Sequence, residues 1–250
     1  MIHGVGFEQF RDAIASLPLR NEYQREDLIC ARFRLLTDRG LEVYYAPFHY
    51  LNRDARLVLV GLTPGWTQME LSYREARSGL AAGLSDDEIF YRIEMKASFG
   101  GRLRDNLVQM LDGVGLRQCL GVSCSELFER RGSNFVHFTS IVSAPIFRGG
   151  ENYRGAGPHP FEVPYLRNWI FEYLPSELLS VPLALVVPLG KIANEAVHVL
   201  CQQGKIDSSR CLIGFPHPSG ANGHRGKIYD AGKSKWMTQI TRWFSSQPSV

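Results

Sequence analysis

Two short stretches carry residue types that can bind a ligand and do chemistry on it, and each follows an apolar run. The first is Gly61-Leu62-Thr63-Pro64-Gly65, after the fully apolar run 57–60, and the second is His217-Pro218-Ser219-Gly220, after the largely apolar run 210–216. An apolar run closed by glycine and proline is typical of a buried parallel strand that delivers a loop to the carboxyl edge of a sheet. Ligands bind at that edge in open α/β sheets. We therefore expect the two loops to converge on one crevice.

Four apolar runs, separated by helical patterns, must position these loops. The predicted strands cover residues 57–61, 134–142, 183–191 and 210–216. The predicted helices cover residues 7–17, 23–36, 69–77, 85–96, 103–111, 165–174, 192–201 and 233–244. Alternating strands and helices predict an α/β fold with three layers, α/β/α, around a central four-stranded, mostly parallel sheet.

The chain shows no repeat and no linker, so we expect one domain over residues 51–250. Residues 1–50 are predicted to form an N-terminal helical extension packed on that core. The aromatic cluster 44–50 contains Pro47, which disfavours a central strand, so packing at a sheet edge is favoured over a surface for stacking bases. The loop 144–164 is long and rich in glycine and proline, which is typical of a functional or mobile segment.

Composition sets bounds on the function. The chain has 250 residues, of which 44% are hydrophobic, enough for a sizeable core. Its net charge of +3 (28 − 25) gives no general attraction for nucleic acid, so a polyanion site must come from local clustering. No stretch is apolar enough for a membrane span or a secretory leader, so we expect a cytoplasmic protein. Five cysteines without a C-x-x-C pair predict neither disulfides nor a metal site.

Several motifs that would indicate other chemistry are excluded. The segment 230–234 ends like a phosphate loop, but Lys227 stands where the first glycine is required. The pair Gly113 and Gly115 lacks the third glycine of a dinucleotide fingerprint and follows a helical pattern. No Gly-x-Ser-x-Gly elbow occurs in the chain.

With these residues in view, the chain resembles the uracil-DNA glycosylase superfamily from about residue 57 to residue 243. It is closest in pattern to the bacterial and archaeal and the mismatch-specific branches. The segments that carry the resemblance, in chain order, are Gly61-Leu62-Thr63-Pro64-Gly65, Phe99-Gly100-Gly101-Arg102, Leu189-Gly190-Lys191 with Ala193, and His217-Pro218-Ser219 followed by Arg225-Gly226.

The resemblance implies a role for each matching residue. His217 would be the electrophile that stabilises the departing base, and Thr63 would hold the attacking water. The implied base-binding residues are Gly61, Leu62, Pro64, Gly65, Phe99, Thr139 and Ser140. Of these, Phe99 would stack on the flipped base, and Thr139 or Ser140 would read its edge. The implied phosphate contacts are Ser219, Gly220, Ala221, His224, Arg225 and Lys227.

The chain also departs from the family pattern. Thr63 stands where some branches have Asp or Asn, and a hydroxyl holds a water without accepting its proton near neutral pH. Thr139 or Ser140 stands in place of a base-reading Asn, and Ala221 is a small residue where the best-known branch inserts a Leu wedge. Ser143 stands where a cluster-binding cysteine is expected, so the resemblance implies no iron–sulfur cluster and no other cofactor.

These features lead to alternative functions. The first is a monomeric, monofunctional DNA glycosylase, a hydrolase that removes uracil or another modified base from single- or double-stranded DNA. The second is a nucleic-acid or nucleotide binding protein of the same fold whose catalysis is altered. A third is hydrolysis of a free nucleoside or nucleotide. No membrane partner is expected.

Overall fold

The apolar run 57–60 forms the middle strand of a parallel sheet in the computed structural model, which describes residues 6–99, 102–220 and 223–247. Contacts along the chain divide it into two units. Unit 1 comprises the described residues of Met1–Leu51, Thr63–Ser98 and Val142–Tyr173. Unit 2 comprises those of Asn52–Leu62, Phe99–Ile141 and Leu174–Val250. Each unit is built around a sheet of its own.

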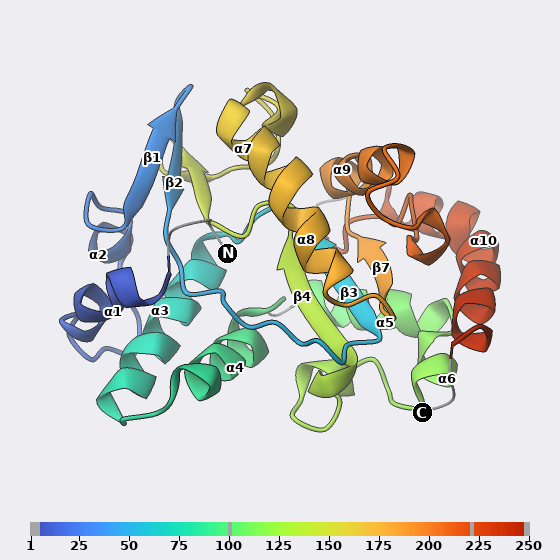
Figure 1. The fold of residues 1–250 in the computed structure, drawn as a ribbon, viewed down its shortest axis with the longest axis horizontal. Coiled ribbons are helices and arrows are strands. Elements are labelled where there is room, and N and C mark those ends of the chain that lie inside the picture. Colours follow the sequence, from blue (N-terminus) through green and yellow to red (C-terminus); the bar gives the residue numbers. More distant parts are fainter. Residues whose placement is uncertain (1–5, 100–101, 221–222, 248–250) are drawn as a thin grey trace. The chain divides into compact units, whose positions relative to one another are not determined.

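The sheet of unit 2 has the order β4-β3-β7, with all strands parallel (Figure 1). Its strands are β3 (Leu57–Gly61), β4 (Val136–Ser140) and β7 (Leu185–Pro188). The first four residues of β3 and all of β7 are buried, as expected for strands covered on both faces. The parallel registry brings the carboxyl end of β3 beside that of β4, where Gly61 pairs with Ser140.

The prediction of a fourth extended strand in this sheet, over residues 210–216, is wrong. Within the described residues, the run 210–216 contributes only one parallel bridge, from Cys211 to Val186 of β7. The backbone then leaves the sheet, because Gly214 has a φ of +95° and Pro216 has no N–H to donate. The α/β class is confirmed, but over residues 6–99, 102–220 and 223–247 the parallel sheet has three strands rather than four.

Five α-helices belong to unit 2 in the described part of the chain. They are α5 (Arg102–Gly113), α6 (Leu116–Leu120), α8 (Leu174–Leu179), α9 (Lys191–Gln202) and α10 (Arg225–Ser245). The helix α8 crosses in front of β4 (Figure 1). Leu189 and Gly190 separate α9 from the end of β7, and Gly190 is the N-cap residue of the helix.

The sheet of unit 1 is antiparallel, with the order β1-β2-β5-β6. Its strands are β1 (Arg34–Asp38), β2 (Leu41–Tyr44), β5 (Ile146–Arg148) and β6 (Glu151–Asn152). Arg39 and Gly40 both have positive φ and form the two-residue turn between β1 and β2, as a right-twisted hairpin requires. Residues 23–36 were predicted to be one helix, and that prediction is wrong beyond Leu28.

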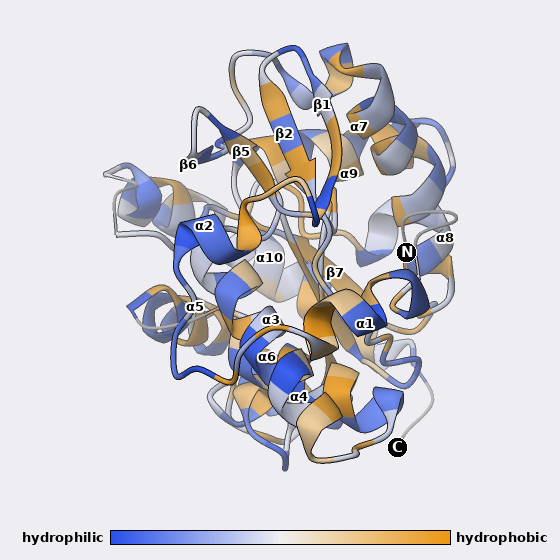
Figure 2. Cartoon of the chain, turned by 90° about the vertical axis from the view of Figure 1, so that its left-hand side faces the viewer, coloured by the Kyte–Doolittle hydropathy of each residue, from blue (hydrophilic) through white to orange (hydrophobic). Residues whose placement is uncertain are grey.

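The α-helices of unit 1 in the described residues are α1 (Glu8–Ala15), α2 (Arg25–Leu28), α3 (Trp66–Ala81), α4 (Asp86–Ala97) and α7 (Pro164–Asn168). The first four of these contribute side chains to one hydrophobic cluster. Figure 2 shows hydrophilic and hydrophobic colours together on α1 and α4, as expected for helices with one buried face. The cluster includes Phe33, Tyr45 and Tyr73, all buried. Residues 6–50 thus contain two strands besides two helices, and the segment is not wholly helical.

The part of the chain that the structure describes contains no helix both long and apolar enough to cross a membrane. Whether residues 51–250 behave as one domain stays a prediction.

Candidate functional site

The carboxyl ends of β3 and β4 bring two of the predicted base-binding residues together. Gly61 and Ser140 are register partners, and the Ser140 Oγ lies 3.2 Å from the position that a Cβ at residue 61 would occupy. A larger residue at position 61 would therefore press on the Ser140 hydroxyl. Glycine at the end of β3 leaves that hydroxyl room to meet a ligand.

The two faces of β4 separate Thr139 from Ser140. Side chains alternate along a strand, so Phe138 and Ser140 share one face while His137 and Thr139 share the other. On the second face, the His137 Nε2 lies 2.8 Å from the Oε1 of Glu177 in α8, and the Thr139 hydroxyl also hydrogen-bonds that carboxylate. Thr139 is thus engaged with α8. Of the two residues predicted to read a base edge, Ser140 is the better candidate.

Through its contacts with His137 and Thr139, Glu177 joins α8 to the face of β4 that carries these two residues. Burial raises the pKa of Glu177, but hydrogen bonds from His137 and Thr139 and the charge of His137 outweigh it and leave the pKa below its usual value. The carboxylate therefore stays ionised. The sequence pattern missed this network, because the two strand residues and Glu177 lie about 40 positions apart in the chain.

Phe99 lies on the same side of β4 as Ser140. Its ring centroid is 5.7 Å from that of Phe138, the β4 residue on the Ser140 face. Phe99 has a φ of +46°, which is unusual for a bulky residue. Its side chain is only partly buried. The structure thus brings the predicted stacking residue and Ser140 to one face of the sheet, as a base-binding surface requires. Gly100 and Gly101 lie outside the described residues.

His217 is held against the turn that follows β7. Gly190 has a φ of +88°, and a Cβ there would lie 2.9 Å from the His217 Cβ. The backbone N–H of Ser219 donates to the His217 Nδ1 over 3.2 Å. A nitrogen that accepts a hydrogen bond carries no proton, so in the neutral ring the proton lies on Nε2. Burial lowers the pKa of His217 below its usual value of 6.5, which favours this neutral form.

Asn194 fixes the two loops around His217, and the sequence analysis missed it. Its Nδ2 donates to the carbonyls of Pro188, Gly190 and Phe215 at 2.8–2.9 Å. Its Oδ1 accepts the N–H of Gly214. One side chain therefore ties the end of β7 to the chain that leads into His217. The only available signal was an Asn in the first turn of a helix after a predicted strand.

The carbonyl of Pro218 accepts hydrogen bonds from two side chains. Asn106 of α5 donates over 2.9 Å, and Arg225 at the start of α10 donates over 2.6 Å. Arg225 was predicted to bind phosphate, and the structure gives it a positioning contact to the His217 loop. Asn106, which the sequence analysis did not single out, has the same role from the other side.

The other predicted phosphate contacts lie near the first turn of α10. His224 is the N-cap residue, and His224, Lys227 and Gly220 are exposed. The Ser219 N–H is already used by His217, so a phosphate contact from this residue would have to come from its hydroxyl. The positive end of a long helix with basic residues in its first turn favours an anion. Ala221 lies outside the described residues.

Thr63, Pro64 and Gly65 belong to unit 1, whereas Gly61 and Leu62 belong to unit 2. The Thr63 hydroxyl donates to the carbonyl of Ala144 over 2.5 Å, so its oxygen can act toward a water only as an acceptor. Pro64 is buried. Gly65 caps α3, and its N–H donates to the Gln68 side chain. The part assigned to Thr63 in catalysis stays a prediction.

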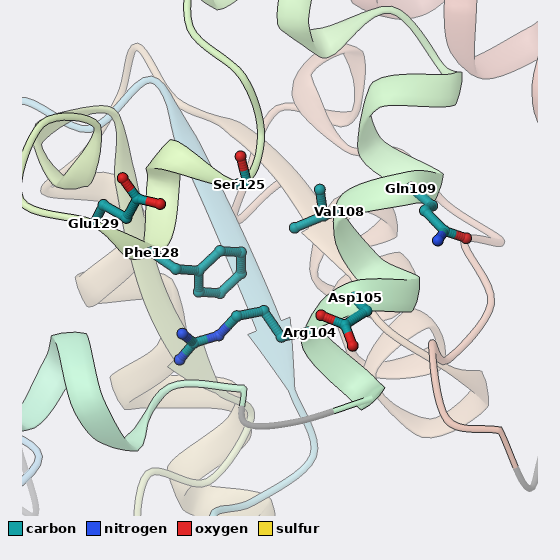
Figure 3. A pocket seen from close by; sticks show the side chains of 7 residues that line it. All are labelled: Arg104, Asp105, Val108, Gln109, Ser125, Phe128 and Glu129. Carbon is teal, nitrogen blue, oxygen red and sulfur yellow. The ribbon is translucent and has the colours of Figure 1, made fainter.

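A pocket of about 430 Å³ opens between α5 and the segment 125–129 (Figure 3). It is lined by Arg104, Asp105, Val108, Gln109, Ser125, Phe128 and Glu129. The Arg104 guanidinium carbon lies 4.7 Å from the Phe128 ring centroid, a cation–π distance. Among residues 6–99, 102–220 and 223–247, no three His, Cys, Asp or Glu side chains gather as metal ligands would.

Comparison with known proteins gives the chain a family. It is 38% identical over 237 residues to the uncharacterized protein YoxB of Bacillus subtilis (strain 168), and the match covers 93% of this chain and 91% of YoxB. The chain belongs to the YoxB family. No protein-family model matches it. The similarity runs over nearly the whole of both proteins, so this family shares both units. The resemblance to uracil-DNA glycosylases stays a prediction.

Proposed function

We propose that this member of the YoxB family is a DNA glycosylase-like hydrolase that releases uracil or another modified base flipped out of DNA. The observation that carries the proposal is the state of His217. Its Nδ1 accepts a backbone N–H, and burial lowers its pKa, so a neutral ring presents Nε2–H as a donor. A neutral donor suits the stabilisation of negative charge that develops only as the base departs.

The reaction itself needs little else from the protein. The oxygen of a water forms a bond to the sugar C1′ and gives up a proton to solvent, while the C1′–N bond breaks and its electron pair leaves with the base, which takes up a proton from solvent. The Nε2–H of His217 would hydrogen-bond the base oxygen on which that charge collects. Phe99 and Ser140, on one face of the sheet, would stack on the base and read its edge.

An excision assay on labelled oligonucleotides tests the proposal. The strands carry uracil, hypoxanthine, xanthine or hydroxymethyluracil, and are offered single-stranded and mismatched. We expect release of at least one base by the wild type and a loss of about 100-fold or more in His217→Ala, as for removal of one transition-state donor. His198→Ala is the matched control, because His198 is an exposed histidine on α9. Base release that is equal in both variants would contradict the role of His217.

A binding protein without base release is the second candidate, and one observation favours it. The Thr63 hydroxyl donates to Ala144, and a hydroxyl is no base that could take a proton from water. Binding to DNA that weakens with salt, survives His217→Ala and is accompanied by no release in any lane would favour this function.

A further inference from the structure

Phe99 keeps a backbone conformation that its residue type disfavours. A φ of +46° on a bulky residue is strained, and such residues persist only where neighbouring groups hold them. The neighbours of Phe99 are therefore informative. To hold this conformation, they must contact both the Phe99 carbonyl, which belongs to the backbone, and the Phe99 ring.

A closed circuit of contacts does both. The Arg104 Nε donates to the Phe99 carbonyl over 2.6 Å, and the Arg104 guanidinium stacks on the Phe128 ring at 4.7 Å. The Phe128 centroid lies 5.1 Å from that of Phe138. Phe138 in turn lies 5.7 Å from Phe99. The circuit starts at the Phe99 carbonyl and returns to the Phe99 ring.

Only arginine can close this circuit at position 104. Its planar guanidinium offers a face to an aromatic ring while its Nε–H donates in the plane. A lysine ammonium has no face and no donor along its stem. Figure 3 shows the Arg104 side chain running beside the Phe128 ring at the pocket between α5 and the segment 125–129.

We propose that Arg104 is a positioning residue that holds Phe99 in its positive-φ conformation and thereby sets the surface on which a planar ligand stacks. The consequence for a flipped base rests on the proposed function. The positioning itself does not, because it concerns contacts within the protein alone.

The positioning is tested by ¹⁹F NMR on the full chain with 4-fluorophenylalanine incorporated at position 99. We expect one sharp resonance in the otherwise wild-type protein. Arg104→Lys and, independently, Phe128→Leu should each shift or broaden it, because each opens the circuit at a different point. Gln109→Ala is the control, since Gln109 is an exposed pocket residue on the same helix and lies outside the circuit. A resonance that neither circuit variant moves would overturn the proposal.

The excision assay then separates the two proposals. If the wild type releases a base, Arg104→Lys should raise KM about tenfold with little change in kcat, because stacking holds the base before and during the reaction. An unchanged KM would overturn the ligand-stacking part of the inference. If the wild type releases nothing, the proposed function fails, while the ¹⁹F spectra still decide whether Arg104 positions Phe99.

Discussion

The contact between Gly190 and His217 yields a prediction about both stability and activity. Gly190 has a φ of +88° and a ψ of 172°, a region that essentially only glycine occupies. Gly190→Ala should cost about 1–3 kcal/mol for this conformation. It should cost about 1–3 kcal/mol more because the new Cβ would lie 2.9 Å from the His217 Cβ, which cannot move without the backbone.

Gly204→Ala is the matched control at the other end of α9. Gly204 has a φ of +67°, but nothing lies within 4 Å of the position of its Cβ. The substitution should therefore cost about 1–2 kcal/mol, for the left-handed conformation alone. The centres of these ranges, about 4 and about 1.5 kcal/mol, differ by about 2.5 kcal/mol, or roughly 5–10 °C in Tm. Thermal unfolding followed by circular dichroism measures this difference.

A double variant isolates the clash from the backbone strain. His217→Gly removes the Cβ that the new methyl group at position 190 would meet, so Gly190→Ala should cost about 1–3 kcal/mol less in that background. In the excision assay, Gly190→Ala should lose about 100-fold in rate, because it displaces the proposed electrophile, whereas Gly204→Ala should keep its rate. Equal Tm values for the two glycine variants, or no coupling in the cycle, would refute the packing of His217 on this turn.

Three further predictions follow from single groups. The folded-state pKa of Glu177 is lowered, so its ionised form adds to the free energy of unfolding above the unfolded pKa near 4.5, and this contribution is lost as pH falls through the folded pKa. In Glu177→Gln, the free energy of unfolding measured in urea should therefore fall less steeply with acidification between about pH 3 and 6. Arg210 is buried and donates to the carbonyls of Leu178, Val181 and Pro182, so Arg210→Met should cost about 3–5 kcal/mol in the same assay, and a cost under about 1 kcal/mol would contradict these bonds. The proposed base release should stay constant on acidification until well below pH 6.5, because burial lowers the pKa of His217; a rate already halved at pH 6.5 would contradict a neutral, buried ring.

Local patterns predicted the sheet of unit 2 well and that of unit 1 poorly. The strands β3 and β7 are apolar runs bounded by glycine, proline or polar turns, and β4 lies in a run of mostly β-branched and aromatic residues, so each is visible without its partners. In contrast, β2 pairs with β5, about 100 residues further along the chain. The loop 144–164 seemed structureless because its strands are only three and two residues long. The first of them, β5, pairs with the distant β2, and β6 pairs in turn with β5.

The same limit applied to the site. His217 follows one predicted strand and Gly190 lies at the end of another, so both segments were singled out from the sequence, and the structure brings them into contact. Arg225, Asn194 and Asn106 are polar side chains whose partners are backbone carbonyls. Backbone acceptors leave no trace in the sequence, so neither the positioning contact of Arg225 nor those of the two asparagines were predictable.

The polar groups of β4 are divided between the two faces of the sheet by the alternation of the strand. On the α8 face, His137 and Thr139 both bond Glu177, and that carboxylate joins helix to sheet. On the other face, Ser140 stands beside a glycine with Phe99 nearby, and the neighbouring contacts are aromatic rings. A ligand approaching Ser140 therefore meets a hydroxyl and a ring, while the Glu177 carboxylate lies on the opposite face. This separation lets the same five-residue strand anchor α8 through a carboxylate and still offer an uncharged surface, as the proposed binding of a planar, neutral base would require.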